Sequence, residues 1–413
     1  MRIGAGVVLN RDGSINRRTL LRVAAQATAA FGAGRWTSAS AQPAPMRIGW
    51  VWPMTGRLTS SFAPLYVGGK IAVDEINAAG GIFGRPIARA EEDDEASPAK
   101  EPGLIRKLRG QEIGIVIGPT GSSQALASIA ATTPARMIQA SYSTAAEAGD
   151  AQKYPYHYQL IFNTTQQADV CVHHMVETLG VKKIGILQEN TAFGEQATAA
   201  TKTALQKLGL DPLSVQVYPI TSPDLSAYVR NLQREGVDGV IAWIANTPNA
   251  AMIFNAMATL KWFPPVAGHS GLMIQSLFEL VPPEAVKHVF ATYYKNFSWT
   301  DTEQPGTRQI TFAKKVAEFP EAKGYEVNVA ASPYYDFIHL IKTVVEAEKS
   351  FDVETIKRGL DNVKGYQGLL GKITLSADSH SGIGLDDIVL VSVASGLDPR
   401  ALGCMRERAS KTS

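Results

Sequence analysis

Short apolar runs alternate with longer segments of helical periodicity along the first half of this chain. The apolar runs predict buried strands, and the longer segments place apolar residues on one face of a helix. Strict alternation of strand and helix favours a parallel sheet with helices on both faces. The predicted strands are 46–52, 87–90, 113–117 and 137–140, and the predicted helices are 66–79, 98–110 and 122–133.

The same alternation begins again after residue 180 and has a similar length. Two such series in succession predict two α/β lobes of similar architecture. The segment 332–348 predicts a further amphipathic helix, whereas 372–375 and 388–393 predict strands that could form a hairpin-like edge. The strands of the second series are 183–187, 215–218, 239–243 and 266–267, and its helices are 193–208, 228–235 and 249–260.

Length and composition agree with two lobes. The 413 residues exceed the size at which one hydrophobic core usually stops growing, and 45% of them are hydrophobic. Charged residues make up 19% of the chain and the mean hydropathy is −0.04, which is the balance of a globular protein. We expect no membrane-spanning helix, because no run of about 18 apolar residues occurs.

The first 41 residues contain the parts of an export signal in their usual order. Arg17 and Arg18 lie in a segment similar to a twin-arginine signal, and a weakly apolar run follows at 23–34. The small residues 39–41 (Ala-Ser-Ala) predict cleavage after Ala41 and a periplasmic protein. An ordinary secretory leader with a chance arginine pair remains open, and no cysteine near the cleavage site supports a lipid anchor.

The charge balance changes once this leader is set aside. The whole chain has a formal net charge of +2, but six arginines and one aspartate lie in residues 1–41. The remainder therefore has 34 basic and 37 acidic side chains. A mildly acidic mature chain argues against nucleic acid as a partner.

The two cysteines, Cys171 and Cys404, leave two interpretations open. A disulfide between them is allowed in the periplasm. Cys171 begins an apolar stretch, however, so a buried free thiol is about as well supported. The tail after Gly403 carries Arg406, Arg408 and Lys411, and we expect it to be mobile.

Motifs of catalysis and metal binding are missing from the sequence. No phosphate-binding loop, no H-E-x-x-H and no C-x-x-C occurs, and Gly268–Gly271 is one residue too short for a nucleophile elbow. His173 and His174 follow Cys171, but consecutive helical side chains point about 100° apart and rarely chelate together. We therefore predict no catalytic residues, no metal site and no cofactor.

Hydroxyl-rich turns follow two successive predicted strands. One turn is Gly118–Ser123 and the other is Ser141–Thr144. Open α/β sheets bind ligands at the carboxyl ends of their strands, and a helix N-terminus there favours an anion. Either turn alone is explained by ordinary helix capping. Both turns on successive strands predict a carboxylate site that needs no arginine.

Several segments resemble the leucine/isoleucine/valine-type periplasmic binding proteins of ABC transporters. The similar segments are 48–56 (IGWVWPMTG), 69–82 (GKIAVDEINAAGGI), 92–94, 116–123 (VIGPTGSS), 193–195, 224–232, 236–239 and 334–336. Over residues 46–395 this resemblance implies a type I periplasmic binding protein: two Rossmann-like lobes with parallel sheets, three crossovers and a cleft between the lobes. The implied parts are lobe one at 46–162 plus 294–370, lobe two at 163–293 plus 371–403, and a tail at 404–413.

The resemblance also implies ligand-binding residues. Ser122 matches the serine that receives the ligand carboxylate, and Ser143 and Thr144 match the pair on the next turn. The matching aromatic positions are Phe62 and Phe193. The remaining two lobe-two positions, an aromatic residue and an acid in the amino-acid binders, fall on Asn246 and Ser270.

Serine stands at position 270, where the resemblance implies an acid in the amino-acid binders, and this difference changes which ligand we expect. An ammonium group buried without a carboxylate costs several kcal/mol, and serine cannot neutralise it. The aromatic residues Phe62, Phe193, Trp52 and Trp243 suggest an apolar or aromatic ligand body. We therefore favour an aromatic acid or a 2-oxo acid. An amino acid whose ammonium pairs with another acid, such as Glu189, and an amide or urea-type solute remain open. The family's cystine pair is also missing, because Ala96 and Gly121 occupy its positions.

The resulting functional hypothesis is a monomeric, non-enzymatic substrate-binding component of an ABC importer. The two lobes would close around a small-molecule ligand, and the closed form would dock on a permease in the inner membrane. A ligand sensor that feeds a signalling partner is the second class of function. A hydrolase on an α/β scaffold is the third, and the strand-end turns contain no nucleophile–base pair that would support it.

Overall fold

The computed structural model describes residues 43–56, 58–323 and 328–409. The predicted export signal and its cleavage site lie outside these residues, as does Lys411. The chain divides into two units, Met1–Ala44 and Pro45–Ser413, and everything below concerns the second.

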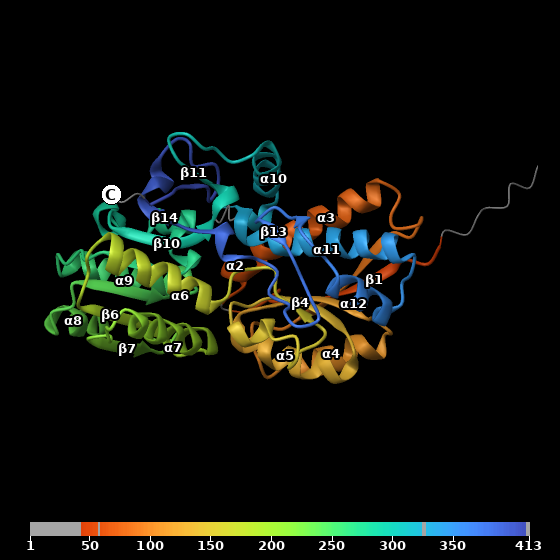
Figure 1. The fold of residues 1–413 in the computed structure, drawn as a ribbon, viewed down its shortest axis with the longest axis horizontal. Helices are drawn as coiled ribbons and strands as arrows, with labels where there is room; N and C mark the ends of the chain where they lie inside the picture. The colour runs from red at the N-terminus through yellow and green to blue at the C-terminus, as the bar shows by residue number, and fades with distance from the viewer. Residues whose placement is uncertain (1–42, 57, 324–327, 410–413) are drawn as a thin grey trace, which may run out of the picture. The chain divides into compact units, whose positions relative to one another are not determined.

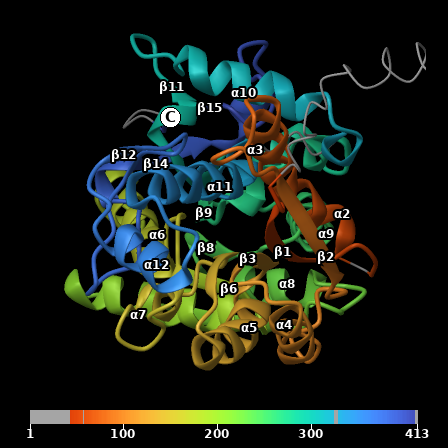
Figure 2. The same ribbon diagram turned by 90° about the vertical axis from the view of Figure 1, so that its right-hand side faces the viewer.

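The first sheet has five parallel strands in the order β2-β1-β3-β4-β5. Its central strands β1, β3 and β4 are almost continuously buried, as expected of strands covered on both faces. Helices α4 and α5 lie on one side of this sheet and α3 and α11 on the other (Figure 2). The strands are β1 (Met46–Trp52), β2 (Ile87–Asp93), β3 (Ile115–Thr120), β4 (Ile138–Tyr142) and β5 (His157–Tyr158), and the helices are α3 (Val67–Ala78), α4 (Glu101–Gly110), α5 (Ser122–Ala135), α11 (Asn328–Glu348) and α12 (Val353–Asp361).

The second sheet has six strands in the order β14-β10-β9-β8-β6-β7, and only β14 runs antiparallel to its neighbour. Figure 1 shows its elements on the left of the view and those of the first sheet on the right. The strands are β6 (Ile184–Glu189), β7 (Ser214–Tyr218), β8 (Gly239–Trp243), β9 (Val266–Gly268), β10 (Val289–Tyr294) and β14 (Ile388–Ser392), and the helices are α6 (Thr164–His173), α7 (Ala192–Lys207), α8 (Ser226–Arg234) and α9 (Thr247–Thr259).

The chain passes between the two sheets three times. It leaves the first sheet after β5, returns after β10, and leaves it again after α12. Residues beyond Gly371 still contact segments next to the first sheet: Gln159, which follows β5, bridges Ser381, and the N–H of Leu375 donates to the carbonyl of Val363, which follows α12. A lobe boundary at Gly371 does not fit these contacts, and we place the third passage near Ile383 instead.

The predicted hairpin-like edge of 372–375 and 388–393 is wrong. The first segment contributes β13 (Lys372–Ile373), which pairs with β12 (Tyr366–Gln367). The second segment is β14, which pairs with β10. Each strand has found a partner from another part of the chain, and the alternation of apolar residues carries no information about which partner a strand takes.

The expected mobility of the tail is also wrong for the part that the structure describes. Strand β15 (Arg406–Glu407) pairs with β11 (Ser298–Trp299), and Arg406 is fully buried. Its guanidinium donates to the carbonyls of Gly403, Met405 and Met273. These hydrogen bonds hold the tail against the loop that follows β9.

Both cysteines are buried free thiols, so the disulfide interpretation does not hold in this structure. Burial raises the pKa of the Cys171 thiol, which makes it unreactive. Among the described residues, no helix combines the length and the apolar character needed to span a bilayer.

Candidate ligand-binding site

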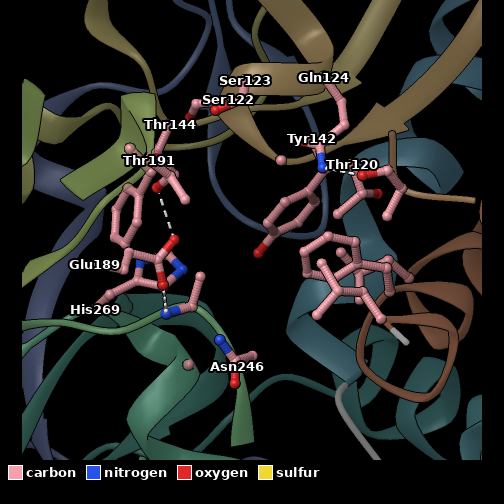
Figure 3. A pocket seen from close by; sticks show the side chains of 18 of the residues that line it. Thr120, Ser122, Ser123, Gln124, Tyr142, Thr144, Glu189, Thr191, Asn246 and His269 are labelled. Carbon is pink, nitrogen blue, oxygen red and sulfur yellow. Dashed lines mark hydrogen bonds between the residues drawn. The ribbon is translucent and has the colours of Figure 1, made fainter. Parts of the chain in front are cut away.

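A cavity of about 290 Å³ is lined by residues from the carboxyl ends of both sheets. Figure 3 shows side chains from both sheets directed into this space. The cavity brings together six of the seven residues that the sequence suggested: Phe62, Ser122, Thr144, Phe193, Asn246 and Ser270. Their part in ligand binding remains a prediction.

The wall from the first sheet is built around the N-terminus of α5. This helix begins at Ser122 without a side-chain cap, so no side chain occupies its first-turn N–H groups. Gly121 precedes it at a φ of +100°, a conformation that favours glycine and turns the backbone from β3 into the helix. Free N–H groups and the helix dipole make this wall suitable for an anion.

Hydroxyl groups surround the same helix N-terminus. Ser122 and Thr144 line the cavity. Ser143 is the seventh suggested residue; it is buried behind them, and its Oγ donates to Ser122 Oγ at 3.3 Å. Ser143 Oγ also accepts from the N–H of Ala145. The geometry therefore gives Ser122 and Thr144 direct access to a ligand, and Ser143 a position that orients Ser122.

The wall from the second sheet contains one acid, Glu189, at the end of β6. Its side chain is 4% exposed, and burial raises its pKa. Glu189 Oε1 accepts from the Thr191 hydroxyl at 2.7 Å, and Oε2 accepts from the Ala245 N–H at 3.0 Å. Asn246 lies beside Ala245 and caps α9, because its Oδ1 accepts from the Asn249 N–H at 3.0 Å.

His269 brings no positive charge to the cavity. Burial lowers its pKa to about 3, so the imidazole is neutral at physiological pH. Its Nδ1 lies 2.7 Å from Gln167 Oε1, and its ring packs 5.0 Å from the ring of Phe193. Among the lining residues that the structure describes there is no lysine or arginine.

Apolar side chains also line the cavity: Leu58, Phe62, Leu65 and Ile274. The two tryptophans expected to help form the ligand surface lie behind it instead. Trp52 packs against Tyr66 at a ring separation of 5.6 Å. Trp243 packs 6.1 Å from Phe193 and donates its indole N–H to Thr201. Neither tryptophan lines the cavity, and only Trp243 packs against a lining residue, Phe193.

Several lining residues had no role assigned from the sequence. Tyr142 belongs to one of the hydroxyl-rich turns and lines the cavity. Ser123 Oγ accepts from the Ala192 N–H at 3.2 Å, which joins the two walls. The turn pattern signalled that these hydroxyls were near a ligand site, but not that Ser123 bridges the two walls.

Comparison with known proteins gives a consistent result. A family model described as periplasmic binding protein matches residues 45–396. The Leu/Ile/Val-binding protein homolog 1 of Brucella suis is 24% identical over 390 residues, which cover 92% of this chain and 98% of the relative.

Solved structures share the fold. A type 1 periplasmic binding protein from Bordetella pertussis aligns with a TM-score of 0.76 at 21% identity, covering 84% of this chain and 96% of that one. The branched-chain amino acid transporter substrate binding protein LivJ from Streptococcus pneumoniae, in complex with isoleucine, gives 0.72 at 19%, covering 84% and 96%. An ABC transporter solute binding protein from Rhodopseudomonas palustris, in complex with 3,4-dihydroxy benzoic acid, gives 0.71 at 17%, covering 84% and 93%.

Proposed function

The chain belongs to the periplasmic binding protein family, and on this premise we propose that it captures a small monocarboxylate with an aromatic or other apolar body for an ABC importer. The family assignment confirms the resemblance seen in the sequence, and the two α/β sheets and their structural neighbours confirm the predicted fold class. A substrate-binding role and an exported, periplasmic protein follow from the family.

One observation carries the proposal: the uncapped N-terminus of α5 opens into the cavity between Ser122 and Thr144. Backbone N–H groups, two hydroxyls and the helix dipole supply the donors that a carboxylate needs. No cationic side chain is required for this arrangement. A second carboxylate on the ligand would find no comparable partner near Glu189, so a monocarboxylate fits best.

The other residues that line the cavity indicate the chemistry of the rest of the ligand. Phe62, Leu65 and Phe193 offer apolar surface, and Ser270 stands where an acid would be needed for an ammonium group. The structure of a distant relative with 3,4-dihydroxy benzoic acid shows that this fold accommodates an aromatic acid. These features favour an aromatic acid or a 2-oxo acid over a free amino acid.

An amino acid is the second candidate, and Glu189 is the observation that favours it. Its carboxylate lines the cavity and could face an ammonium group in place of the missing acid at position 270. A structural neighbour holds isoleucine. The raised pKa of Glu189 weighs against this candidate, because a site built for a cation usually stabilises the ionised carboxylate.

The mechanism we propose is closure of two lobes that hold opposite walls of the cavity. Ser123 and Ala192 form one hydrogen bond across the cleft, and Glu147 accepts from Gln196 Nε2 at 3.1 Å at another point. A ligand that contacts both walls stabilises this closed arrangement. The closed form then docks as a monomer on a permease. A signalling partner in place of the permease is the alternative use of the same closure.

Export by the twin-arginine route and cleavage after Ala41 are part of this proposal. So is the assignment of residues 46–162 and 294 to about 382 to lobe one, with 163–293 and about 383–403 forming lobe two. Mass spectrometry of the secreted protein would give the new N-terminus directly.

A thermal-shift panel on residues 42–413 tests the proposed ligand class. The panel pairs phenylalanine and leucine with their 2-oxo acids and adds benzoate and its hydroxylated forms. A ligand at 100 times its dissociation constant stabilises the protein by about 2.7 kcal/mol. Shifts with the ammonium-free acids support the proposal. Shifts with the amino acids alone would replace it with the second candidate.

A further inference from the structure

Tyr334, on helix α11, is a buried tyrosine to which the proposed function assigns no role. It begins the segment 334–336, one of those that resemble the family. Its side chain is 1% exposed and is not among those that line the cavity. Its ring packs 4.7 Å from the ring of Tyr66, which is also buried. Two phenol hydroxyls therefore lie together inside the first lobe, where each needs hydrogen-bond partners from the protein.

The ladder between strands β3 and β4 is interrupted where the two hydroxyl-rich turns begin. The register shifts by one residue between Ile117 and Thr120, so residues 118–119 lie opposite Ser141 alone. Pairing resumes with Thr120 opposite Tyr142, and both of these residues line the cavity (Figure 3). Backbone groups at such a bulge lose their ladder partners and must find others.

The Tyr334 hydroxyl fills this interruption. It accepts from the Tyr142 N–H at 3.0 Å and donates to the Pro119 carbonyl at 3.3 Å. Its oxygen also lies 3.5 Å from the Tyr66 hydroxyl. One side chain of α11 therefore joins the ends of β3 and β4 at the point where their own hydrogen bonds do not.

Tyr66 extends the same network to the neighbouring strand β1. Its hydroxyl donates to the Val51 carbonyl at 2.7 Å and accepts from the Thr120 hydroxyl at 3.3 Å. A phenol has a single proton to donate, and here Val51 receives it, which leaves the oxygen free to accept from Thr120. The carboxyl ends of β1, β3 and β4 are thus connected through the hydroxyls of two tyrosines.

These strand ends lead directly into the proposed carboxylate site. Thr120 is followed by Gly121 and Ser122, and Tyr142 stands shortly before Thr144. The Gly121 N–H also donates to the Tyr142 carbonyl at 2.9 Å, so the two turns are held to each other. A shift of either strand end would change the distance between the Ser122 and Thr144 hydroxyls. Donors aimed at an anion work well only when they are held in place before the anion arrives.

We propose that Tyr334 and Tyr66 are positioning residues of the ligand site, whose hydroxyls set the spacing of the two turns and thereby the affinity for a carboxylate, without contacting the ligand. This inference rests on the proposed function and deepens it. A purely structural role would give a different result: loss of a hydroxyl would lower the stability of the fold and leave ligand affinity unchanged.

The variant Tyr334→Phe tests the inference, because it removes one hydroxyl and keeps the ring. Calorimetry on residues 42–413 measures the affinity of wild type and variant for benzoate and phenylpyruvate, each compared with its primary amide. We expect the acids to bind about tenfold more weakly to the variant, the scale of one impaired hydrogen bond to a charged group. The uncharged amides depend less on the alignment of the donors, so the preference for acid over amide should fall as well.

The matched control is Tyr335→Phe, on the same helix. The Tyr335 hydroxyl donates to Glu75 Oε2 at 2.8 Å, and neither residue lines the cavity. This variant also loses a buried or half-buried phenol hydrogen bond, but one that contacts neither turn. Its affinity for the acids should stay within about twofold of wild type, because distant sites act independently.

The outcomes separate this inference from the proposed function. Wild-type affinity for the acids in Tyr334→Phe would overturn the inference and leave the proposed function standing. An equal loss for acids and amides, or an equal loss in Tyr335→Phe, would overturn it too, since neither reflects alignment of the carboxylate donors. Failure of both acids to bind the wild-type protein would contradict the proposed function, and the inference with it.

The variant Tyr66→Phe repeats the test at the other hydroxyl. It disconnects β1 from the network, and we expect the same weaker binding of the acids and the same loss of preference over the amides. It also decides the question if Tyr334→Phe does not fold. Unchanged affinity in Tyr66→Phe would show that the pair of tyrosines does not position the turns.

Discussion

Individual hydroxyl and N–H groups form the part of the cavity that we propose for a ligand carboxylate. Ser122 and Thr144 were identifiable from the turns that contain them, because such turns follow strands at the edge where α/β sheets bind ligands. Glu189 was named from the sequence only as a possible partner for an ammonium group, and its surroundings could not be predicted in the same way. Its burial and its two hydrogen bonds depend on residues 191 and 245, which approach it only in the folded protein.

At this scale, the variant Ser122→Ala should weaken binding of the tightest benzoate by about 10- to 150-fold. It removes one hydroxyl that faces the carboxylate, and a hydrogen bond to a charged group contributes about 1.5–3 kcal/mol. Calorimetry measures the affinity. Thr203→Ala, at an exposed position of helix α7, is the control. Unchanged affinity in Ser122→Ala would remove this residue from the carboxylate site.

Secondary-structure elements were the most predictable level of this fold. The strands β1, β6 and β8 and the helices α5, α7 and α11 all lie within a few residues of their predicted ranges, because apolar periodicity is a local property. Pairing was less predictable. The partner of β14 is β10, about a hundred residues earlier, and no local pattern at 388–393 specifies that choice.

The packing of α4 against α5 encloses two acids, Asp94 and Glu101, which are both fully buried. Burial and their mutual proximity raise the pKa of Glu101 to about 9, and burial raises that of Asp94 to about 6. The Glu101 carboxyl therefore keeps its proton at neutral pH in the folded protein and releases it on unfolding. This contribution to the unfolding free energy should fall as pH rises toward 9.

The variant Glu101→Gln tests this directly. It removes the contribution of Glu101, so the decline in unfolding free energy between pH 6.5 and 9 should flatten by up to about 1.4 kcal/mol per pH unit. Denaturant titrations across this range measure the slope. Glu112→Gln at an exposed position is the control. The same slope in Glu101→Gln and wild type would show that Glu101 is ionised in the folded protein.

The tail strand β15 provides a second prediction at the scale of elements. Arg406→Ala should lower the unfolding free energy by about 2–4 kcal/mol, because it leaves the buried carbonyls of Met273, Gly403 and Met405 without their donor. Arg400→Ala, at an exposed ion pair with Asp398, should cost less than about 1 kcal/mol. Similar small effects in both variants, measured by denaturant unfolding, would favour the mobile tail expected from sequence.

At the scale of the molecule, the strand ends of two sheets contribute to one cavity. The two-lobe α/β architecture followed from the repeated alternation of strands and helices, whereas the cross-cleft contacts required the structure. The contacts between Ser123 and Ala192 and between Glu147 and Gln196 join helix α7 to the opposite wall. Such contacts stabilise the closed arrangement in addition to the ligand.

Removing both contacts in Ser123→Ala/Gln196→Ala should speed ligand release by about 5- to 150-fold, because each of the two hydrogen bonds contributes about 0.5–1.5 kcal/mol to closure. Stopped-flow displacement of a bound benzoate measures the release rate. Thr203→Ala, on the same helix α7 but exposed, provides the comparison. A release rate equal to that of wild type would show that the ligand alone holds the two walls together.

The most direct test of the central claim compares the tightest-binding benzoate with its benzamide by calorimetry on residues 42–413. The two compounds have nearly the same shape and differ in whether the group at the α5 N-terminus is an anion. The account predicts that the acid binds at least 100-fold more tightly than the amide. Equal affinity, or tighter binding of the amide, would contradict a cavity built for a carboxylate.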